Sequence, residues 1–166
     1  MKNLFTVLFI VLTMPLAKSQ DHEHNVGVKR GATSAVTYRY LKNPHQPVEF
    51  ILSLDDPGLK LTVLKESFDP KIIGKSDNLM FVKGYGGHVG YTYRKSYNFF
   101  WRTYELPNRE FSPFLGVDIY IALEYHVMSI PVIFGIDYNP YFEFSNNQFF
   151  RMDLFNLSFN LRYAFN

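Results

Sequence analysis

Hydrophobic and polar side chains alternate strictly over three consecutive stretches in the C-terminal third of the chain. Between residues 115 and 127 every odd position is apolar or aromatic, whereas the even positions are small, polar or charged. The same alternation runs from residue 130 to 144 and from 155 to 165. Because successive side chains of a strand point to opposite faces, each stretch predicts a strand with one apolar and one polar face.

These three predicted strands are long. Strands of soluble sheets typically have about five or six residues. A strand that crosses a bilayer needs about 9–11 residues and alternates between apolar positions that face lipid and polar positions that face the lumen. The pattern therefore predicts transmembrane strands.

Five shorter segments upstream alternate in the same way and are separated by turn signals. Asn43-Pro44 and Asp55-Asp56-Pro57-Gly58 mark two of these turns. The predicted upstream strands are residues 25–31, 35–41, 48–54, 59–68 and 79–94. With the three later strands, they predict an all-β fold, an eight-stranded antiparallel up-and-down transmembrane barrel, because only a closed barrel leaves no unpaired strand edge in lipid.

An even number of strands places both chain ends on one side of the membrane, which we expect to be the periplasm. The short turn at Met128-Ser129 is then periplasmic, and residues 95–112 form the longest outside loop. Lys65 and Lys83 fall on the lipid-facing side and are expected near the periplasmic ends of their strands, where a charge costs little. Pro140 is expected near the outer rim, because proline cannot donate to the strand ladder.

The N-terminus has the three parts of a secretory signal peptide. Lys2 supplies positive charge, residues 4–12 are almost wholly apolar, and Ala17 and Ser19 supply small residues before a cleavage site. We therefore expect residues 1–19 to be a signal peptide and residues 20–166 to be the outer-membrane barrel domain. A single membrane anchor is the alternative, although the apolar run is shorter than the ~20 residues of a spanning helix.

Composition narrows the function classes. The chain has 166 residues, enough for one domain, and no cysteine, which excludes disulfides and thiol chemistry. Its 17 Phe and 12 Tyr residues suit a surface that meets lipid. A formal net charge of +2 is too small to indicate nucleic acid binding, so we expect no nucleic acid partner.

Charged residues fall mainly on the inward side of the predicted strands. An eight-stranded barrel is only wide enough for its own side chains, and buried charges must be paired. We therefore predict a lumen charge network that plugs the barrel. A narrow polar path for ions or small solutes is the alternative. The predicted network consists of Arg39, Glu49, Glu66, Arg94, Asp118, Glu124, Asp137 and Arg162.

No sequence motif indicates catalysis. The chain has no nucleophile elbow, phosphate-binding loop or zinc-protease motif, so we assign no catalytic residues, no cofactor and no metal site, and expect no enzyme. His88 and His126 are interpreted as members of the lumen network rather than as catalysts. Residues 21–24, which read Asp-His-Glu-His, could hold a metal but are better explained as a flexible mature N-terminus.

An aromatic cluster lies in the predicted long loop, at Phe99, Phe100 and Trp101. An apolar patch in a loop can mark contact with a partner. The same residues could equally belong to the aromatic girdle at the outer leaflet. We favour the girdle and keep these three residues as a candidate loop contact.

The chain resembles small eight-stranded outer-membrane barrel proteins of the OmpA/OmpX type, and specifically the short variants common in Bacteroidetes. The resemblance covers most of the chain after residue 20 and implies the fold and the membrane rather than an activity. It also implies that Phe165, here followed by Asn166, is a recognition signal for the barrel-insertion machinery. The resembling segments are residues 34–40, 48–49, 84–90, 116–119, 123–125, 130–132, 137–140 and 161–165.

The expected function is a structural or surface-interaction role in the cell outer membrane, carried mainly by the loop at residues 95–112. The expected partners are outer-membrane lipid, the insertion machinery and an unidentified extracellular partner, and we expect a monomer. The alternatives are a narrow pore, a lipid-modifying outer-membrane barrel enzyme, and a soluble lipocalin-like binder with the reverse polarity.

Overall fold

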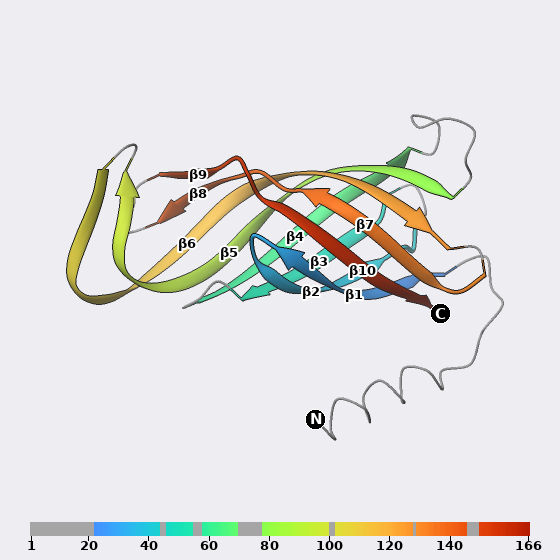
Figure 1. The fold of residues 1–166 in the computed structure, drawn as a ribbon, viewed down its shortest axis with the longest axis horizontal. Coiled ribbons are helices and arrows are strands. Elements are labelled where there is room, and N and C mark those ends of the chain that lie inside the picture. Colours follow the sequence, from blue (N-terminus) through green and yellow to red (C-terminus); the bar gives the residue numbers. More distant parts are fainter. Residues whose placement is uncertain are drawn as a thin grey trace, which may run out of the picture.

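The computed structural model describes residues 22–43, 46–54, 58–69, 78–99, 102–127, 129–145 and 150–166, without the side chains of residues 94–110. Within those residues, ten strands form one antiparallel sheet (Figure 1). The predicted signal peptide lies outside the described residues. The strands are β1 (His24–Gly31), β2 (Ser34–Tyr40), β3 (Val48–Leu54), β4 (Gly58–Asp69), β5 (Leu79–Phe99), β6 (Arg102–His126), β7 (Val132–Tyr138), β8 (Tyr141–Ser145), β9 (Arg151–Asp153) and β10 (Leu157–Phe165).

The sheet closes on itself because β5 pairs with both β4 and β6. Strands β7 and β8 both pair with β6 and together occupy one position in the wall. Strands β9 and β10 occupy the next position, where β9 pairs with β8 and β10 pairs with β7. The described strands therefore form an eight-stranded antiparallel barrel, which confirms the predicted architecture.

The strands are staggered around the barrel. From Val28, the register followed through β2, β3, β4 and β5 arrives at Leu115 of β6. Followed the other way, through β10 and β7, it arrives at Tyr125, ten positions further along the same strand. A stagger of this kind tilts the strands of a closed barrel relative to its axis, and eight strands enclose a space that side chains can fill.

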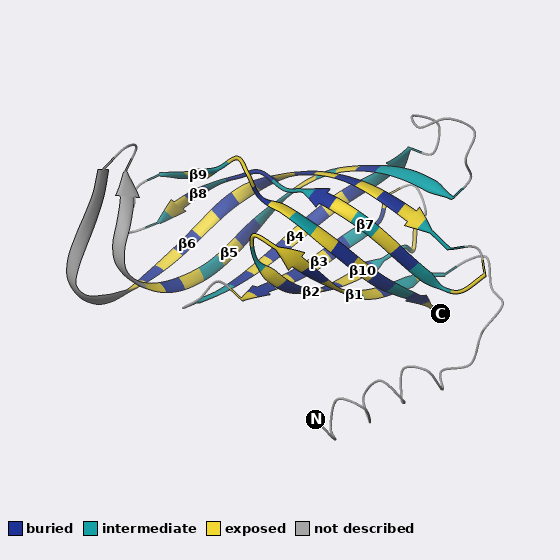
Figure 2. Ribbon diagram, in the orientation of Figure 1, coloured by how far each residue is buried: buried dark blue, intermediate teal, exposed yellow. Residues whose placement is uncertain are grey.

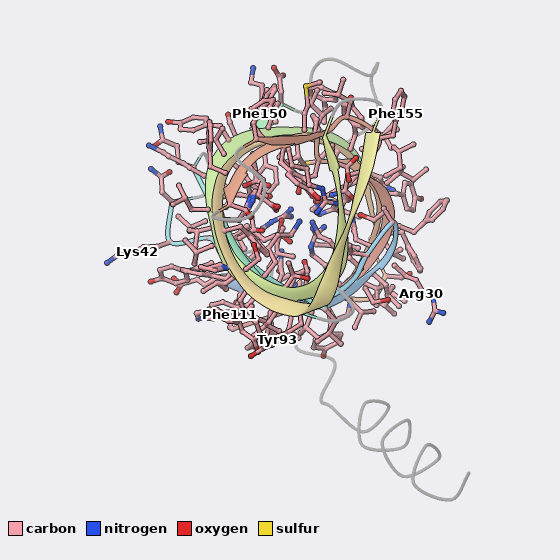
Figure 3. All side chains as sticks on the ribbon, turned by 90° about the vertical axis from the view of Figure 1, so that its left-hand side faces the viewer. Arg30, Lys42, Tyr93, Phe111, Phe150 and Phe155 are labelled. Atoms are coloured by element: carbon pink, nitrogen blue, oxygen red, sulfur yellow. The ribbon has the colours of Figure 1, made fainter. Side chains whose placement is uncertain are left out.

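The polarity of the wall follows the predicted alternation. From Phe111 to Tyr125 of β6 the odd positions are exposed and the even positions are buried: Leu115 is 61% exposed and Asp118 is 2% exposed (Figure 2). Viewed along the barrel, nitrogen and oxygen atoms gather inside the ring, while Phe111, Phe150 and Phe155 point outward (Figure 3). The barrel therefore has a polar interior and an apolar outer surface.

Residues 95–112 do not form the loop that we predicted. Strands β5 and β6 continue past Arg94 as an antiparallel hairpin that reaches Phe99 and Arg102 and extends beyond the other strands (Figure 1). The hairpin contains a register shift. There β5 advances from Arg94 to Ser96 while β6 moves from Glu110 to Glu105.

The prediction for Pro140 was also wrong. Pro140 does not lie at the rim but separates β7 from β8 within the wall, where its carbonyl oxygen accepts from the N–H of Ile119 at 3.0 Å. Proline has no N–H to return to Ile119. The side-chain amide of Asn139 donates to the carbonyl oxygen of Ile119 at 2.8 Å instead. One predicted strand is thus divided into two without losing its position in the barrel.

Several inward glycines make room for side chains of neighbouring strands. Gly116 of β6 lies between His88 of β5 and Glu143 of β8 in the register. A Cβ atom at Gly116 would collide with the carbonyl oxygen of Phe142 and with the ring of His88. The missing side chain therefore lets the His88 ring lie across β6.

We predict that Gly116→Ala lowers the free energy of unfolding by about 1–3 kcal/mol, the usual cost of overpacking. Gly87→Ala is the matched control, because its added Cβ would lie 3.0 Å from the carbonyl oxygen of Gly116 and would meet no side chain of the described residues. Guanidinium titration of the folded barrels measures both values. Equal unfolding midpoints for the two variants would contradict this account of Gly116.

Candidate functional site

Two arginines at the centre of the lumen join carboxylates from three other strands. Arg162 of β10 contacts Glu49 through Nη2 at 2.7 Å and Glu124 through Nη1 at 2.6 Å. Arg39 of β2 contacts Glu124 through Nη2 at 2.8 Å and Glu66 through Nε at 2.7 Å. Glu124 therefore bridges the two guanidinium groups. Inward parity on β2, β3, β4, β6 and β10 brings these side chains together.

Lys29 extends this arrangement to another side of the barrel. Its Nζ lies 2.8 Å from Asp137 Oδ2 and 3.4 Å from Glu49 Oε2. The same ammonium stands 4.6 Å from the centre of the Tyr120 ring. The Asn160 amide donates to Asp137, which fixes that carboxylate from β10. We call the set Lys29, Arg39, Glu49, Glu66, Tyr120, Glu124, Asp137, Asn160 and Arg162 the central network.

Burial decides what the central network can do. The side chains of Arg39, Glu49, Glu66 and Glu124 are all 0% exposed. Desolvating a charge costs several kcal/mol, and several close partners of opposite charge are needed to offset that cost. The network satisfies this need by linking strands on opposite sides of the lumen. It therefore joins strands of the wall across the lumen.

A second polar cluster lies nearer the β5–β6 hairpin. His88 Nδ1 is 2.6 Å from Asp118 Oδ2, and His88 Nε2 is 3.5 Å from Glu143 Oε2. The His88 ring meets the Tyr141 ring edge-on at 5.2 Å. Lys60 Nζ stands 4.1 Å from the centre of the Tyr141 ring. We call these five residues the His88 cluster.

The His88 cluster links three neighbouring strands of the wall, β5, β6 and β8. His88 of β5 reaches over Gly116 to Glu143 of β8, so it joins strands on both sides of β6. The side chains of His88 and Asp118 are both 0% exposed. The nearby hydroxyls of Ser112 and Ser145 contact each other at 2.8 Å. Among the described residues, no group of three or more His, Cys, Asp or Glu could hold a metal ion.

The sequence predicted that most of these side chains face the lumen, but it did not predict that they form two separate clusters. Seven of the eight predicted network residues are buried in the lumen, and Asp118 belongs to the His88 cluster instead of the central network. Arg94 lies on β5, but its side chain is outside the described ones. His126 is partly buried, with Nε2 3.6 Å from Glu124 Oε2. The predicted network left out Lys29, Tyr120 and Asn160, whose inward parity was the available signal.

Aromatic side chains gather on the outer surface near both ends of the barrel. Close to the hairpin, the ring centres of Tyr91, Tyr93 and Phe111 lie 5.4–5.9 Å apart. At the opposite end, where β1 begins and β10 ends, His24 stacks on Tyr40 at 5.3 Å and on Phe165 at 5.6 Å. His24 thus belongs to an aromatic group. Asp21, the first residue of the segment 21–24 that was considered for metal binding, lies outside the described residues.

The candidate loop contact is not among the described side chains. The backbone of Phe99 ends β5, and Phe100 and Trp101 lie outside the described residues. Whether these three aromatic residues contact lipid or a partner therefore stays a prediction.

We predict that Arg162→Met lowers the free energy of unfolding by about 3–5 kcal/mol, because it leaves Glu49 and Glu124 buried with one cation fewer. The double variant Arg162→Met, Glu49→Met removes a matched pair and should recover at least about half of that loss. Lys42→Met, at an exposed position, is the control. Guanidinium titration compares the unfolding free energies of the wild type, the single variant, the double variant and the control. A double variant less stable than Arg162→Met would contradict the pairing of Arg162 with Glu49.

Among the described residues, no helix is long and apolar enough to cross a membrane. In comparisons with known proteins, no family model and no curated protein matches the chain.

Proposed function

We propose that this chain is a structural protein of the cell outer membrane, where its barrel crosses the bilayer and presents the β5–β6 hairpin to the outside. The observation that carries the proposal is the apolar outer surface. Tyr85, Leu115 and Phe159 are each more than 60% exposed, and they lie on different strands. Soluble monomers rarely expose a continuous apolar surface larger than a few hundred Å², and lipid is the solvent that suits such a wall.

The aromatic groups at the two ends support the same placement. Tyrosine and phenylalanine gather at both membrane interfaces of outer-membrane barrels, around an apolar band about 25 Å tall. The group formed by Tyr91, Tyr93 and Phe111 and the group around His24 and Phe165 occupy opposite ends of the wall. The expected signal peptide at residues 1–19 would provide export.

The reversed polarity argues against the lipocalin-like alternative, which needs an apolar interior for its ligand. Here the lumen holds Arg39, Arg162 and their carboxylate partners instead. The buried central network also argues against the narrow pore, because its side chains occupy the middle of the lumen. No observation on the described residues favours the lipid-modifying enzyme.

Fractionation of cells that express the full chain tests the membrane proposal. We expect recovery in the outer membrane, and an unboiled gel band that migrates differently from the boiled band, because a closed barrel resists detergent. Gly87→Ala should retain this heat shift. Recovery in the soluble periplasm without a heat shift would overturn the proposal.

Planar-bilayer recordings test whether the lumen is closed. We expect no discrete conductance steps from the heat-shifted protein, because the central network fills the lumen. A general porin, recorded under the same conditions, is the positive control. Reproducible unitary steps that scale with the amount of folded barrel would replace the structural role with the pore.

A further inference from the structure

A groove of about 930 Å³ runs across the outer surface of the barrel. It follows the register between two parallel rows of outward side chains. One row includes Ser34, Arg30 and Phe159, and the other includes Val36, Val28 and Leu161. Side chains two positions apart on a strand are separated by roughly 6.6 Å, so a hydrocarbon chain can rest along the furrow between the two rows.

The groove is apolar along most of its length. Its lining comes from seven strands, β3, β2, β1, β10, β7, β6 and β5, and is mostly aliphatic or aromatic. Neighbouring strands lie about 4.8 Å apart, so a groove that crosses seven of them is roughly 29 Å long. The groove follows the curved wall around most of the barrel, and an acyl chain can lie along part of it.

Arg30 supplies the charge at this groove. It is exposed, it lies one residue before the end of β1, and its side chain points away from the barrel (Figure 3). Two of its outward neighbours are apolar, Val28 on the same strand and Phe159 across the register with β10. Among the described residues, no acidic side chain forms an ion pair with Arg30. By contrast, the outward Lys83 has Asp69 at 3.9 Å.

We propose that the groove binds an anionic phospholipid, with its phosphate on Arg30 and one acyl chain between the two rows. A guanidinium group on a lipid-facing wall needs an anion, and arginine binds phosphate through two parallel hydrogen bonds. The Ser34 hydroxyl lies next to Arg30 in the register and is a second donor for the headgroup. The proposal rests on the membrane placement proposed above, because that placement brings lipid to the wall.

Native mass spectrometry of the detergent-purified full chain measures the binding. Phosphatidylglycerol is the probe, and phosphatidylcholine with the same acyl chains is the neutral comparison. We expect one phosphatidylglycerol retained in preference to phosphatidylcholine. Arg30→Gln should weaken this binding about fivefold, which corresponds to about 1 kcal/mol for one basic residue at an anionic lipid. Lys42→Gln, another exposed basic position, should leave it unchanged.

A matched pair of valine variants tests whether the acyl chain lies in the groove. Val36 lies in the groove and is 55% exposed, while Val117 lies on β6 outside the groove lining and is 56% exposed. Val36→Trp should fill the space between the rows and abolish retention of phosphatidylglycerol. Val117→Trp should have no effect on it.

Three results would overturn the lipid site: equal binding of the two lipids, equal affinity in Arg30→Gln and Lys42→Gln, or displacement of the lipid by millimolar inorganic phosphate. The last result would indicate a site for free phosphate. The heat shift is measured on the same samples. A wild-type barrel that shifts but retains no phosphatidylglycerol refutes this inference alone, whereas a wild-type chain without any heat shift refutes the membrane placement.

Discussion

The contact on which the barrel depends is the bridge from Arg162 through Glu124 to Arg39. Eight strands enclose a lumen filled by side chains, and strict alternation places charged residues there. A charge buried without a partner costs several kcal/mol, so the inward charges are tolerable only as a connected set. Glu124 satisfies two guanidinium groups at 2.6 and 2.8 Å, and Glu49, Glu66 and Asp137 complete the set. Strands distant in sequence are thereby fixed across the lumen.

Space in the lumen is the second constraint, and glycine helps to meet it. Gly116 lets the His88 ring cross β6 to Glu143, so the His88 cluster joins strands that do not pair directly. The break at Pro140 occurs at the same part of the wall, where Asn139 contacts both Ile119 and Asp118. The wall is therefore interrupted where side-chain contacts can replace the missing ladder bond. Interior packing and backbone pairing support each other at this level.

Period-two alternation predicted the strands, their facing and most of the inward charges, because each of these follows from parity alone. The β5–β6 hairpin was missed because its pairing passes through a register shift between Arg94 and Ser96, and no local sequence pattern reveals such a shift. The position of Pro140 was wrongly predicted for a similar reason. The free-energy cost of its missing N–H depends on whether the Asn139 side chain can reach the Ile119 carbonyl oxygen. That Asp118 lies beside His88 and not in the central network could not be predicted, because it depends on the stagger of the strands. Only the register of the closed barrel defines that stagger.

The central claim is that the outward face of this wall meets lipid. The chain has no cysteine, so single cysteines at Val117, Ile119 and Ile121 can carry spin labels on the outward face of β6 without competing thiols. Collision rates with oxygen, which enters lipid, and with a water-soluble nickel chelate then report the surroundings of each label in reconstituted vesicles. The account predicts that oxygen collisions dominate at all three positions. Dominant nickel collisions at all three would contradict it.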